Sequence, residues 1–456
     1  MTLIKSISGI RGTIGGEPQE NLTPVDIVEC TAGFGSWLKK KGNRLKVVVG
    51  RDGRISGPQV STLAIQTLLM QGIDVVDLGL STTPTVEMAV KYLDAGAGII
   101  FTASHNPKQW NALKFLNESG EFISAADGSH ILELISEKDL SFVEVDELGT
   151  LTHEEGMMDR HIEDMFNLPY VYVEDIKAMK YKVVVDCINS TGAISVIPLL
   201  ERLGCEVIAI NEEMNGEFAH NPEPLAKHLT QLSQAVTGNQ AHLGIAVDPD
   251  VDRLAFMCED GALFGEEYTL VAVADYLLSI KPGNTVSNLS STRALADVTR
   301  KYGQTYTASA VGEVNVVNQM KATDAIIGGE GNGGVILPDL HYGRDALVGI
   351  ALFLNLLASK NLSMTALKAT YPSYEMVKDK LQLTPEIDVD ALLLKAKEVF
   401  KNETLNDVDG VKIDFEDGWV HLRKSNTEPI IRIYSEGKSK IKAEELIDKV
   451  KTSIFD

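Results

Sequence analysis

Continuous apolar runs that alternate with helical stretches constrain the fold of this chain more than any other feature. The first round contains the run KVVVG, a helical stretch from Val60 to Met70, the run IDVVDLG, a helix from about Pro84 to Leu93 and the run AGAGIIFT. Strands that are apolar throughout and separated by helices are typical of a parallel sheet covered on both faces. The pattern returns at YKVVVDC and again near Asn284, so we predict an α/β fold with three similar α/β domains and mixed, mainly parallel sheets.

The last part of the chain has a different composition. After Tyr371-Pro372 the sequence becomes charged, and the runs VKIDF and WVHLR indicate antiparallel strands joined at the turn signal Glu416-Asp417-Gly418. Here we expect a C-terminal α+β domain. Because 456 residues are too many for one hydrophobic core, we predict domains over residues 1–150, 151–256, 257–370 and 371–456.

Charge and hydropathy exclude several classes of function. Subtracting 64 acidic residues from 42 basic ones leaves a net charge of -22, whereas nucleic-acid binding requires a basic face. No apolar run approaches the roughly 18 residues of a membrane span, and the start MTLIKSISGIRG lacks the apolar core of a signal peptide. The four cysteines show no C-x-x-C spacing, which suits a reducing compartment. We therefore predict a cytoplasmic protein that binds neither nucleic acid nor membrane.

The stretch FTASHNPKQWNALKFL combines a nucleophile, a proton-transfer group and a cation in one loop. Ser104 is the candidate nucleophile, His105 follows it, and Lys114 stands at the start of the next apolar run. A serine hydroxyl is weakly nucleophilic until a base or a metal activates it. Asn106-Pro107 is a turn signal, so we expect Ser104 on a bent, exposed connection at the edge where open α/β sheets bind ligands. An ordinary polar turn is the alternative, and the loops described next favour the site.

Three aspartates follow the run HLGIAV. Asp248, Asp250 and Asp252 stand at alternate positions of DPDVDR, and three carboxylates so spaced can converge on one hard cation such as Mg²⁺. A calcium EF-hand loop is excluded, because Arg253 occupies position six, where a glycine is required, even though Glu259 falls at position twelve. We favour a divalent metal site over a solvated acidic turn.

A glycine-rich segment, GGEGNGG, ends the third round. It matches G-x-G-x-x-G, but a strand-like run, VILP, follows where a dinucleotide site needs a helix, so we reject a Rossmann site. Glu330 and Asn332 on such a turn are suited to hydrogen bonding with vicinal hydroxyls. A plain β-turn with an incidental glutamate is the alternative.

Arginines gather at two further places. Arg11 lies between glycines in SGIRGT, which could bring it close to a phosphate or could be a turn with a surface arginine. The segment RKSNTEP and the strand IIRIY bring two arginines, a lysine and hydroxyls together, which indicates an anion cradle rather than an ordinary hairpin loop. The candidate phosphate ligands are Arg423, Ser425, Asn426, Thr427 and Arg432.

Four motifs in order, TASHNP, DPDVDR, GGEGNGG and RKSNTEP, make the chain resemble the α-D-phosphohexomutase family over nearly its whole length. The resemblance implies four domains around a central cleft and a resting enzyme with Ser104 phosphorylated. It also implies one Mg²⁺ per active site, held by the Ser104 phosphate and the three aspartates. Arg11, Lys114 and Arg253 would line the transfer site, Glu330 and Asn332 would hold sugar hydroxyls, and the cradle would bind the phosphate that does not react.

The reaction implied by this family starts from a hexose phosphate and passes through a hexose 1,6-bisphosphate, which also serves as activator. The intermediate turns end for end before a phosphate returns to Ser104, and we expect the fourth domain to close as a lid. Lys114 and His105 are both candidates to receive the proton of the attacking hydroxyl. We expect a monomer or a homodimer.

The sugar loop departs from the commonest bacterial pattern of this family. Bacterial phosphoglucosamine mutases usually carry serine and histidine where Asn332 and Gly334 stand here, and the loop is more similar to an archaeal-type branch. We therefore expect a phosphoglucosamine mutase first and a phosphomannomutase/phosphoglucomutase second. A metal-dependent sugar phosphatase that hydrolyses its phosphoserine and a non-catalytic sugar-phosphate sensor are the alternatives from other classes.

Overall fold

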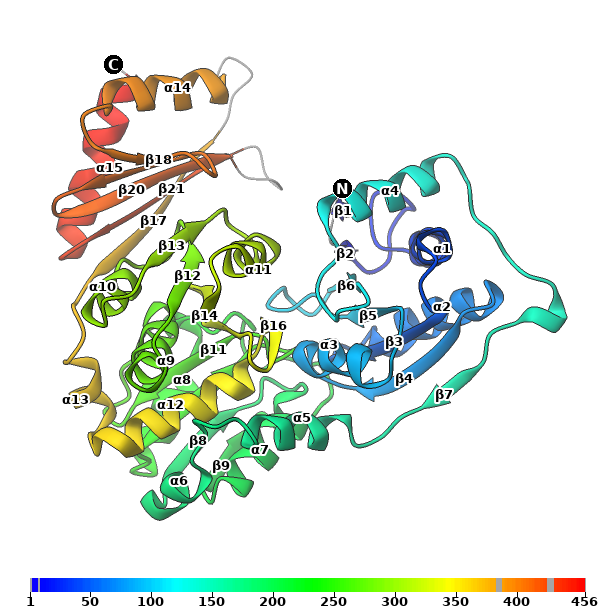
Figure 1. Cartoon of the computed structure of the whole chain (residues 1–456), viewed down its shortest axis with the longest axis horizontal. Coiled ribbons are helices and arrows are strands. Elements are labelled where there is room, and N and C mark those ends of the chain that lie inside the picture. Colours follow the sequence, from blue (N-terminus) through cyan, green and yellow to red (C-terminus); the bar gives the residue numbers. More distant parts are fainter. Residues whose placement is uncertain (1, 7–8, 383–387, 425–429, 456) are drawn as a thin grey trace.

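The computed structural model describes residues 2–6, 9–382, 388–424 and 430–455, which form four sheets with helices packed on them. The sheets follow one another along the chain, as the colour gradient of Figure 1 shows. Three contain parallel and antiparallel pairs, and the fourth is antiparallel. The predicted α/β fold with a different C-terminal domain is confirmed.

The first sheet has seven strands in the order β1-β2-β6-β5-β3-β4-β7. Its helix α1 begins with Pro24 after the capping box of Thr23 and Asp26, and it ends at Gly42 in the left-handed conformation. The elements of this part are β1 (Ile4–Ser6), β2 (Gly9–Thr13), α1 (Pro24–Lys41), β3 (Lys46–Arg51), α2 (Gly57–Met70), β4 (Asp74–Leu80), α3 (Thr83–Tyr92), β5 (Ala97–Phe101), β6 (Trp110–Leu116), α4 (Ala125–Ser136), η1 (Val145–Glu147) and β7 (Leu151–His153).

The second and third sheets have the orders β11-β10-β8-β9 and β13-β12-β14-β15-β16. The second part consists of α5 (Met157–Phe166), α6 (Val173–Met179), β8 (Lys182–Asp186), α7 (Gly192–Arg202), β9 (Glu206–Ile210), η2 (Ala226–His228), α8 (Thr230–Gly238), β10 (Leu243–Val247) and β11 (Leu254–Cys258). The third consists of α9 (Glu266–Ile280), β12 (Asn284–Asn288), α10 (Ala294–Lys301), β13 (Tyr306–Ser309), α11 (Glu313–Ala322), β14 (Ala325–Glu330), β15 (Gly334–Leu337), β16 (His341–Arg344), α12 (Ala346–Lys360) and α13 (Met364–Lys368).

The fourth sheet has the order β17-β21-β20-β19-β18. The predicted hairpin of VKIDF and WVHLR is present as β19 and β20, whereas strands β7 and β17 are not apparent from the sequence pattern. The elements are β17 (Glu375–Gln382), α14 (Val389–Val399), β18 (Thr404–Asn406), β19 (Val411–Phe415), β20 (Gly418–Lys424), β21 (Ile430–Gly437) and α15 (Lys440–Phe455).

One four-strand arrangement recurs in the first three sheets. It reads β4-β3-β5-β6 in the first, β9-β8-β10-β11 in the second and β13-β12-β14-β15 in the third. In each case the first three strands are parallel, and the fourth returns antiparallel to the third through a short loop. These three return loops, residues 102–109, 248–253 and 331–333, carry or adjoin all the motifs predicted for the first three rounds. The internal repeat is therefore a repeat of topology.

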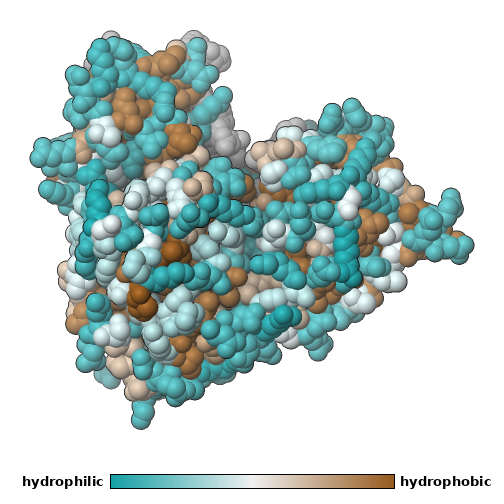
Figure 2. Space-filling model, in the orientation of Figure 1, coloured by the Kyte–Doolittle hydropathy of each residue, from teal (hydrophilic) through white to brown (hydrophobic). Residues whose placement is uncertain are grey.

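The second and third rounds share one hydrophobic core, while the first and fourth parts have cores of their own. Helix α12 is apolar on nearly all sides and buried from Ala346 to Leu357. Figure 2 shows polar side chains over most of the visible surface and an indentation between the fourth domain and the first. Within the described residues, no helix has the length and apolar character needed to cross a bilayer.

We propose two adjustments to the predicted domain bounds. Strand β7 pairs with β4 of the first sheet, so the first domain extends beyond residue 150 to at least His153. A division at 256/257 would cut β11, which pairs along its whole length with β10. Placing that division after Cys258 keeps the second sheet intact. The four cysteines are free thiols, three of them buried and Cys205 partly so.

Candidate active site

Ser104 lies in the return loop between β5 and β6, in a left-handed backbone conformation with φ of 48°. The expectation of an exposed serine was wrong, because Ser104 is only 6% exposed. The aspartate loop of the second round covers it, and its hydroxyl donates a 2.6 Å hydrogen bond to Asp248 Oδ2. Its backbone N–H donates to Thr102 Oγ1 at 2.9 Å, which helps to hold the strained conformation. The nucleophile is thus fixed in a buried site.

A buried arginine that sequence reasoning missed shapes this loop. The Arg54 guanidinium donates to the backbone carbonyls of Ser104 at 2.5 Å and Asn106 at 2.7 Å, and to those of Pro107 and Trp110 at 2.9 Å. Asp52 balances its charge through a 3.0 Å ion pair. The available signal was the motif R-D-G-R directly after the apolar run KVVVG, at the same sheet edge as Ser104.

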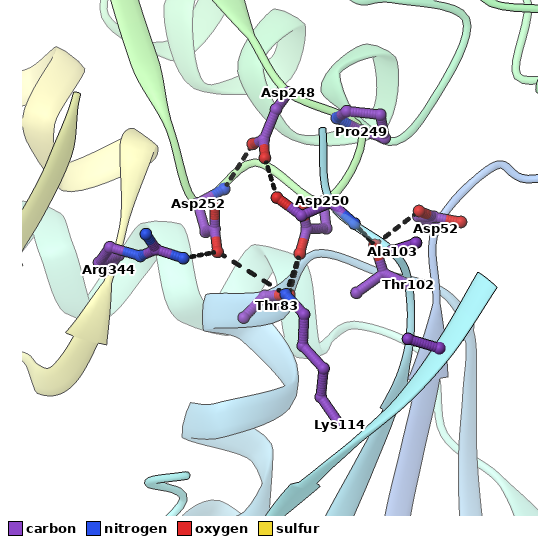
Figure 3. Close-up of polar contacts among 12 residues, drawn as sticks. Asp52, Thr83, Thr102, Ala103, Lys114, Asp248, Pro249, Asp250, Asp252 and Arg344 are labelled. Atoms are coloured by element: carbon purple, nitrogen blue, oxygen red, sulfur yellow. Dashed lines mark hydrogen bonds and ion pairs between the residues drawn. The ribbon is translucent and has the colours of Figure 1, made fainter. Parts of the chain in front are cut away.

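The three aspartates of the second loop converge, as predicted. Asp248, Asp250 and Asp252 are all buried, and one ligand oxygen from each lies within 4.8 Å of the others. Figure 3 shows them pointing toward one another, with Lys114 approaching from β6 and Arg344 from β16. The Asp248 Oδ1 atom is held by the backbone N–H groups of Asp252 at 3.1 Å and Arg253 at 3.0 Å.

The protein holds one oxygen of each of the other two carboxylates and leaves the second oxygen unused. Asp250 Oδ2 accepts from Thr83 Oγ1 at 2.7 Å and from Lys114 Nζ at 2.9 Å, whereas its Oδ1 has no partner within the described residues. Asp252 Oδ2 accepts from Arg344 Nη2 at 2.7 Å, and its Oδ1 also lacks a partner there. Buried carboxylate oxygens left in this state are costly unless a cation binds them. The triad therefore fits a hard divalent metal ion.

Electrostatics agree with a site built for a cation. Burial, followed by the charges of Asp252 and Asp250, raises the pKa of Asp248 well above its usual range. Burial also opposes ionisation of Asp250, but the charge of Lys114 and the hydrogen bond from Thr83 hold its pKa below the usual value. Repulsion among the three carboxylates is what a bound divalent ion would relieve.

The two candidate proton acceptors differ in charge. Burial would lower the pKa of Lys114, but Asp250 and Asp252 outweigh burial and raise it, so this ammonium stays protonated. Burial, followed by the charges of Arg253 and Arg344, lowers the pKa of His105 well below its usual value, so its imidazole is neutral. His105 Nδ1 lies 3.3 Å from Ser104 Oγ.

The glycine-rich turn brings Glu330 to the same place. Gly333, with φ of 87°, lies so close to β11 that a Cβ atom would be 2.1 Å from the Leu254 carbonyl oxygen. The Leu254 N–H donates to the Gly333 carbonyl at 3.2 Å, which connects the glycine-rich turn to β11, the strand that follows the three aspartates. Glu330 is 5% exposed and accepts from Asn288 Nδ2 at 2.9 Å, and Asn332 Nδ2 lies 3.5 Å from its carboxylate. The β14–β15 hairpin confirms that a strand follows this turn, where a dinucleotide site needs a helix.

Arg344, which the sequence analysis did not single out, joins the loops. Its guanidinium pairs with Asp252 at 2.7 Å, Glu330 at 2.8 Å and Glu313 at 3.0 Å. Burial opposes ionisation of Glu330, but the charge of Arg344 and the hydrogen bond from Asn288 lower its pKa, so this carboxylate is ionised. The sequence held one signal, an arginine-aspartate pair immediately before the buried helix α12.

Of the remaining predicted cations, Arg253 contacts the triad through its backbone, whose N–H donates to Asp248 Oδ1 at 3.0 Å. Arg253 Nη1 is 3.8 Å from Glu223. Arg423 pairs with Asp409 of its own domain at 3.3 Å and faces Arg432 across the β20–β21 ladder. Burial, followed by the charge of Arg432, lowers the pKa of Arg11, which lies on β2. Three predicted phosphate ligands, Ser425, Asn426 and Thr427, lie outside the described residues.

Four consecutive parts of the chain match the domains of one protein family. Residues 3–141, 159–261 and 265–374 match the phosphoglucomutase/phosphomannomutase alpha/beta/alpha domains I, II and III, and residues 380–453 match the C-terminal domain of the same family.

Individual relatives extend over nearly the whole chain. A phosphoglucomutase/phosphomannomutase of Thermococcus kodakarensis is 35% identical over 96% of this chain and 96% of its own length. A probable phosphoglucosamine mutase of Methanopyrus kandleri is 33% identical over 97% of this chain and 95% of its own. A solved structure of a phosphoglucomutase/phosphomannomutase family protein from Burkholderia thailandensis superposes with a TM-score of 0.84 at 25% identity, covering 99% of this chain and 96% of that one.

Proposed function

The chain belongs to the phosphoglucomutase/phosphomannomutase family, and on that premise we propose that it interconverts glucosamine 6-phosphate and glucosamine 1-phosphate. The observation that carries the proposal is the contact between the loops of the first two rounds. Ser104 Oγ lies 2.6 Å from Asp248, inside a triad of aspartates with unused oxygens. A phosphoserine beside a divalent metal is what phosphoryl transfer to a sugar hydroxyl requires.

The metal in this proposal is one Mg²⁺ ion. Asp248, Asp250 and Asp252 would hold it together with the phosphate on Ser104, and the donor set of carboxylate oxygens suits Mg²⁺ better than softer metals. When bound, the ion neutralises charge that develops on the transferring phosphoryl group. The residues of the chain supply the rest of the site: Arg54 orients the Ser104 loop, and Lys114 adds a positive charge beside Asp250.

The proposed reaction consists of two phosphoryl transfers in opposite directions. In the first, the sugar O1 attacks the phosphorus of phosphoserine 104; the O1–P bond forms, the P–Oγ bond breaks, and Oγ takes up a proton. The hexose 1,6-bisphosphate then turns end for end, and Ser104 Oγ attacks the phosphorus of the 6-phosphate. The Oγ–P bond forms, the P–O6 bond breaks, Oγ gives up its proton, and O6 takes up a proton. Added hexose 1,6-bisphosphate would act as an activator by phosphorylating Ser104. Positioning and charge neutralisation carry most of such a transfer.

The proton of the attacking sugar hydroxyl needs an acceptor. His105, which is neutral and 3.3 Å from Ser104 Oγ, and Lys114, which is held protonated by the aspartates, are the two candidates. A group must lose its proton before it can serve as a base, so replacing each side chain separately distinguishes them by the pH profile of kcat. Loss of the acidic limb, along which kcat rises as the base loses its proton, in one variant alone identifies the acceptor.

Sugar recognition falls to the third and fourth domains. Glu330 is ionised and fixed by Asn288 and Arg344, so its remaining lone pairs can accept hydrogen bonds from vicinal hydroxyls, with Asn332 beside it. The phosphate that does not react would bind to the cradle of the fourth domain, which consists of Arg423, Ser425, Asn426, Thr427 and Arg432. Arg11 and Arg253 would line the path between the two phosphate positions.

A second candidate is a phosphomannomutase/phosphoglucomutase with the same mechanism. The 35% identical Thermococcus kodakarensis relative carries that name, whereas the Methanopyrus kandleri relative is named a probable phosphoglucosamine mutase. The two candidates share every residue of the phosphoryl transfer and differ only in the substituent at C2 of the sugar.

The test is a substrate panel with Mg²⁺ and catalytic hexose 1,6-bisphosphate, which compares kcat/KM for glucosamine, mannose and glucose 1-phosphates by phosphorus NMR. A preference for glucosamine phosphate of about tenfold, or about 1.4 kcal/mol of transition-state discrimination, supports the first candidate. A preference for mannose or glucose phosphate supports the second. Inorganic phosphate as the only product would instead identify a phosphatase. Ser104→Ala must abolish turnover in every case.

We further propose that the enzyme acts in the cytoplasm as a monomer or a homodimer. Four free thiols suit a reducing compartment. Analytical ultracentrifugation measures the oligomeric state directly.

A further inference from the structure

The side chain of Arg344 crosses the glycine-rich turn at Gly334, the first residue of β15, which has no side chain to obstruct it. The arginine ends β16, and a Cβ atom on Gly334 would lie only 2.4 Å from Arg344 Cδ and 3.0 Å from its Cγ. The side chain passes over this glycine and continues into the site between the second and third loops, where it is buried. Glycine at position 334 is therefore a condition for the path of Arg344, and the two residues form one structural unit.

The planar guanidinium of Arg344 donates hydrogen bonds to two loops, the aspartate loop and the glycine-rich turn. Nη2 donates to Asp252 Oδ2 at 2.7 Å, and Nη1 donates to Glu330 Oε2 at 2.8 Å. Glu313 fixes the arginine from behind, since its carboxylate accepts the Arg344 backbone N–H at 3.1 Å and lies 3.0 Å from Nε. A lysine has one point charge and could not hold both carboxylates in this geometry.

The contact with Asp252 decides which oxygen of that carboxylate remains for a metal. Arg344 engages Oδ2, so the oxygen of Asp252 that has no hydrogen-bond partner among the described residues is Oδ1. The contact with Glu330 similarly fixes one oxygen and, after the opposing effect of burial, keeps this carboxylate ionised. Groups that orient ligands in this way commonly change metal affinity by about 10- to 100-fold.

We propose that Arg344 is a positioning residue shared by the metal and sugar loops, which orients Asp252 for the divalent metal and Glu330 for the sugar through the space left by Gly334. This inference rests on the proposed function and adds a residue that serves both ligands. A single substitution of Arg344 should therefore weaken the binding of two ligands, the divalent metal and the sugar phosphate, which contact separate loops.

Calorimetric titration of the Ser104→Ala protein, which cannot turn over, tests the claim. The parent is titrated with Mg²⁺ alone and, separately, with glucosamine 6-phosphate in the absence of metal. In the Ser104→Ala, Arg344→Lys protein we expect Kd to rise about tenfold for each probe, because the cation is kept and the fork is lost. Arg300→Lys, on the exposed face of α10 with its ion pair to Asp297, is the matched control and leaves both values unchanged.

Two further variants separate positioning from general damage to the fold. Gly334→Ala keeps Arg344 but obstructs its path, so it must reproduce the double loss even if Arg344→Lys fails to fold. Asp250→Asn must weaken Mg²⁺ binding alone, because Asp250 has no contact with Glu330 among the described residues. Thermal melts establish that each titrated protein is folded at the temperature of the titration.

The outcomes are distinct. Unchanged Kd values for both probes in the Arg344→Lys and Gly334→Ala proteins, or a change for one probe only, would overturn the inference while the proposed function stands. A Ser104→Ala parent that binds Mg²⁺ but no hexose phosphate of the panel would overturn the proposed function, and the inference with it.

Discussion

Two buried clusters in this protein have the composition of a metal site, and they differ in what their polar atoms are doing. Asp248, Asp250 and Asp252 form the acidic triad, whereas His161, His341 and Asp345 form a second group, which we call the histidine cluster. The triad comes from one loop and leaves two carboxylate oxygens without partners in the described structure. In the histidine cluster, by contrast, the polar atoms hold three domains together.

In the histidine cluster, histidines face carboxylates of the protein itself, although His341 Nδ1 and both Glu87 oxygens make no hydrogen bond among the described residues. His161 on α5 contacts Thr85 Oγ1 of α3 at 3.0 Å through one ring nitrogen and Asp345 at 2.9 Å through the other. His341 lies 3.3 Å from Asp345 and 3.3 Å from Glu87 of α3. Asp345 also caps α12 through the N–H groups at its start. Spacing alone therefore does not identify a metal site; the unbalanced negative charge of three carboxylates does, whereas histidines offset the carboxylates of the second cluster.

The largest expected difference between the clusters concerns activity. Asp248→Asn removes a ligand and should reduce kcat by at least about 10³-fold, since a metal ion contributes several kcal/mol to such a transfer. Its melting temperature should stay constant or rise, because the variant removes repulsion from Asp250 and Asp252. Asp345→Asn is the matched control and should lose stability instead. Steady-state kinetics and thermal melts check both, and a strongly destabilised Asp248→Asn protein would contradict the distinction.

The second prediction concerns stability. His341→Gln removes the cation between two buried carboxylates, Glu87 and Asp345, and should lower the free energy of unfolding by about 3–5 kcal/mol. Its Mg²⁺ affinity should remain that of the wild type. Urea denaturation gives the first quantity and calorimetric titration the second, and a large loss of metal affinity would show that the clusters act as one.

The third prediction is a pH dependence that originates in the histidine cluster. Burial would lower the pKa of His341, but its polar contacts with Asp345 and Glu87 and the negative charges of both raise it to about 9. Burial raises the pKa of Glu87 to about 8, against the effect of His341. Because both groups have a higher pKa in the folded state, the folded protein binds more protons than the unfolded chain, and the free energy of unfolding falls as pH increases.

The contribution of His341 should be complete below its unfolded pKa of about 6.5 and should disappear as pH rises through about 9. It amounts to at most about 3 kcal/mol at 1.36 kcal/mol per pKa unit. The groups that face His341 are Glu87 from α3, His161 from α5 and Asp345 at the start of α12. Urea denaturation between pH 6 and 10 measures the effect, and the difference between wild type and His341→Gln should shrink towards the alkaline end.

The smallest effect expected is stabilisation by the metal. Mg²⁺ at about 100 times its Kd should stabilise the wild type by about 2.7 kcal/mol, because only the folded triad binds it. Asp248→Asn should lose this gain, and His341→Gln should keep it. Melting temperatures with and without Mg²⁺ provide the measurement; an equal gain in Asp248→Asn would place the bound ion outside the acidic triad.

The sequence by itself determined the fold class and the order of the motifs. Apolar runs separated by helices require a covered, mainly parallel sheet, and each motif follows the third strand of its round, so Ser104, Asp248 and Glu330 had to appear at sheet edges. Alternate carboxylates in a six-residue loop are close in sequence, and for this reason the acidic triad could be found without a structure.

Only the tertiary structure decided which residues of different loops touch. Ser104 is buried because the second round packs over it; Arg54 and Arg344 became part of the site because their long side chains reach carbonyls and carboxylates distant in sequence. The histidine cluster combines residues from the second and third domains and contacts the first through Thr85 and Glu87, and no local pattern marks His161 or His341. The partner of a buried ionic side chain depends on which loops are brought together by packing, and the periodicity of the sequence does not predict these long-range contacts.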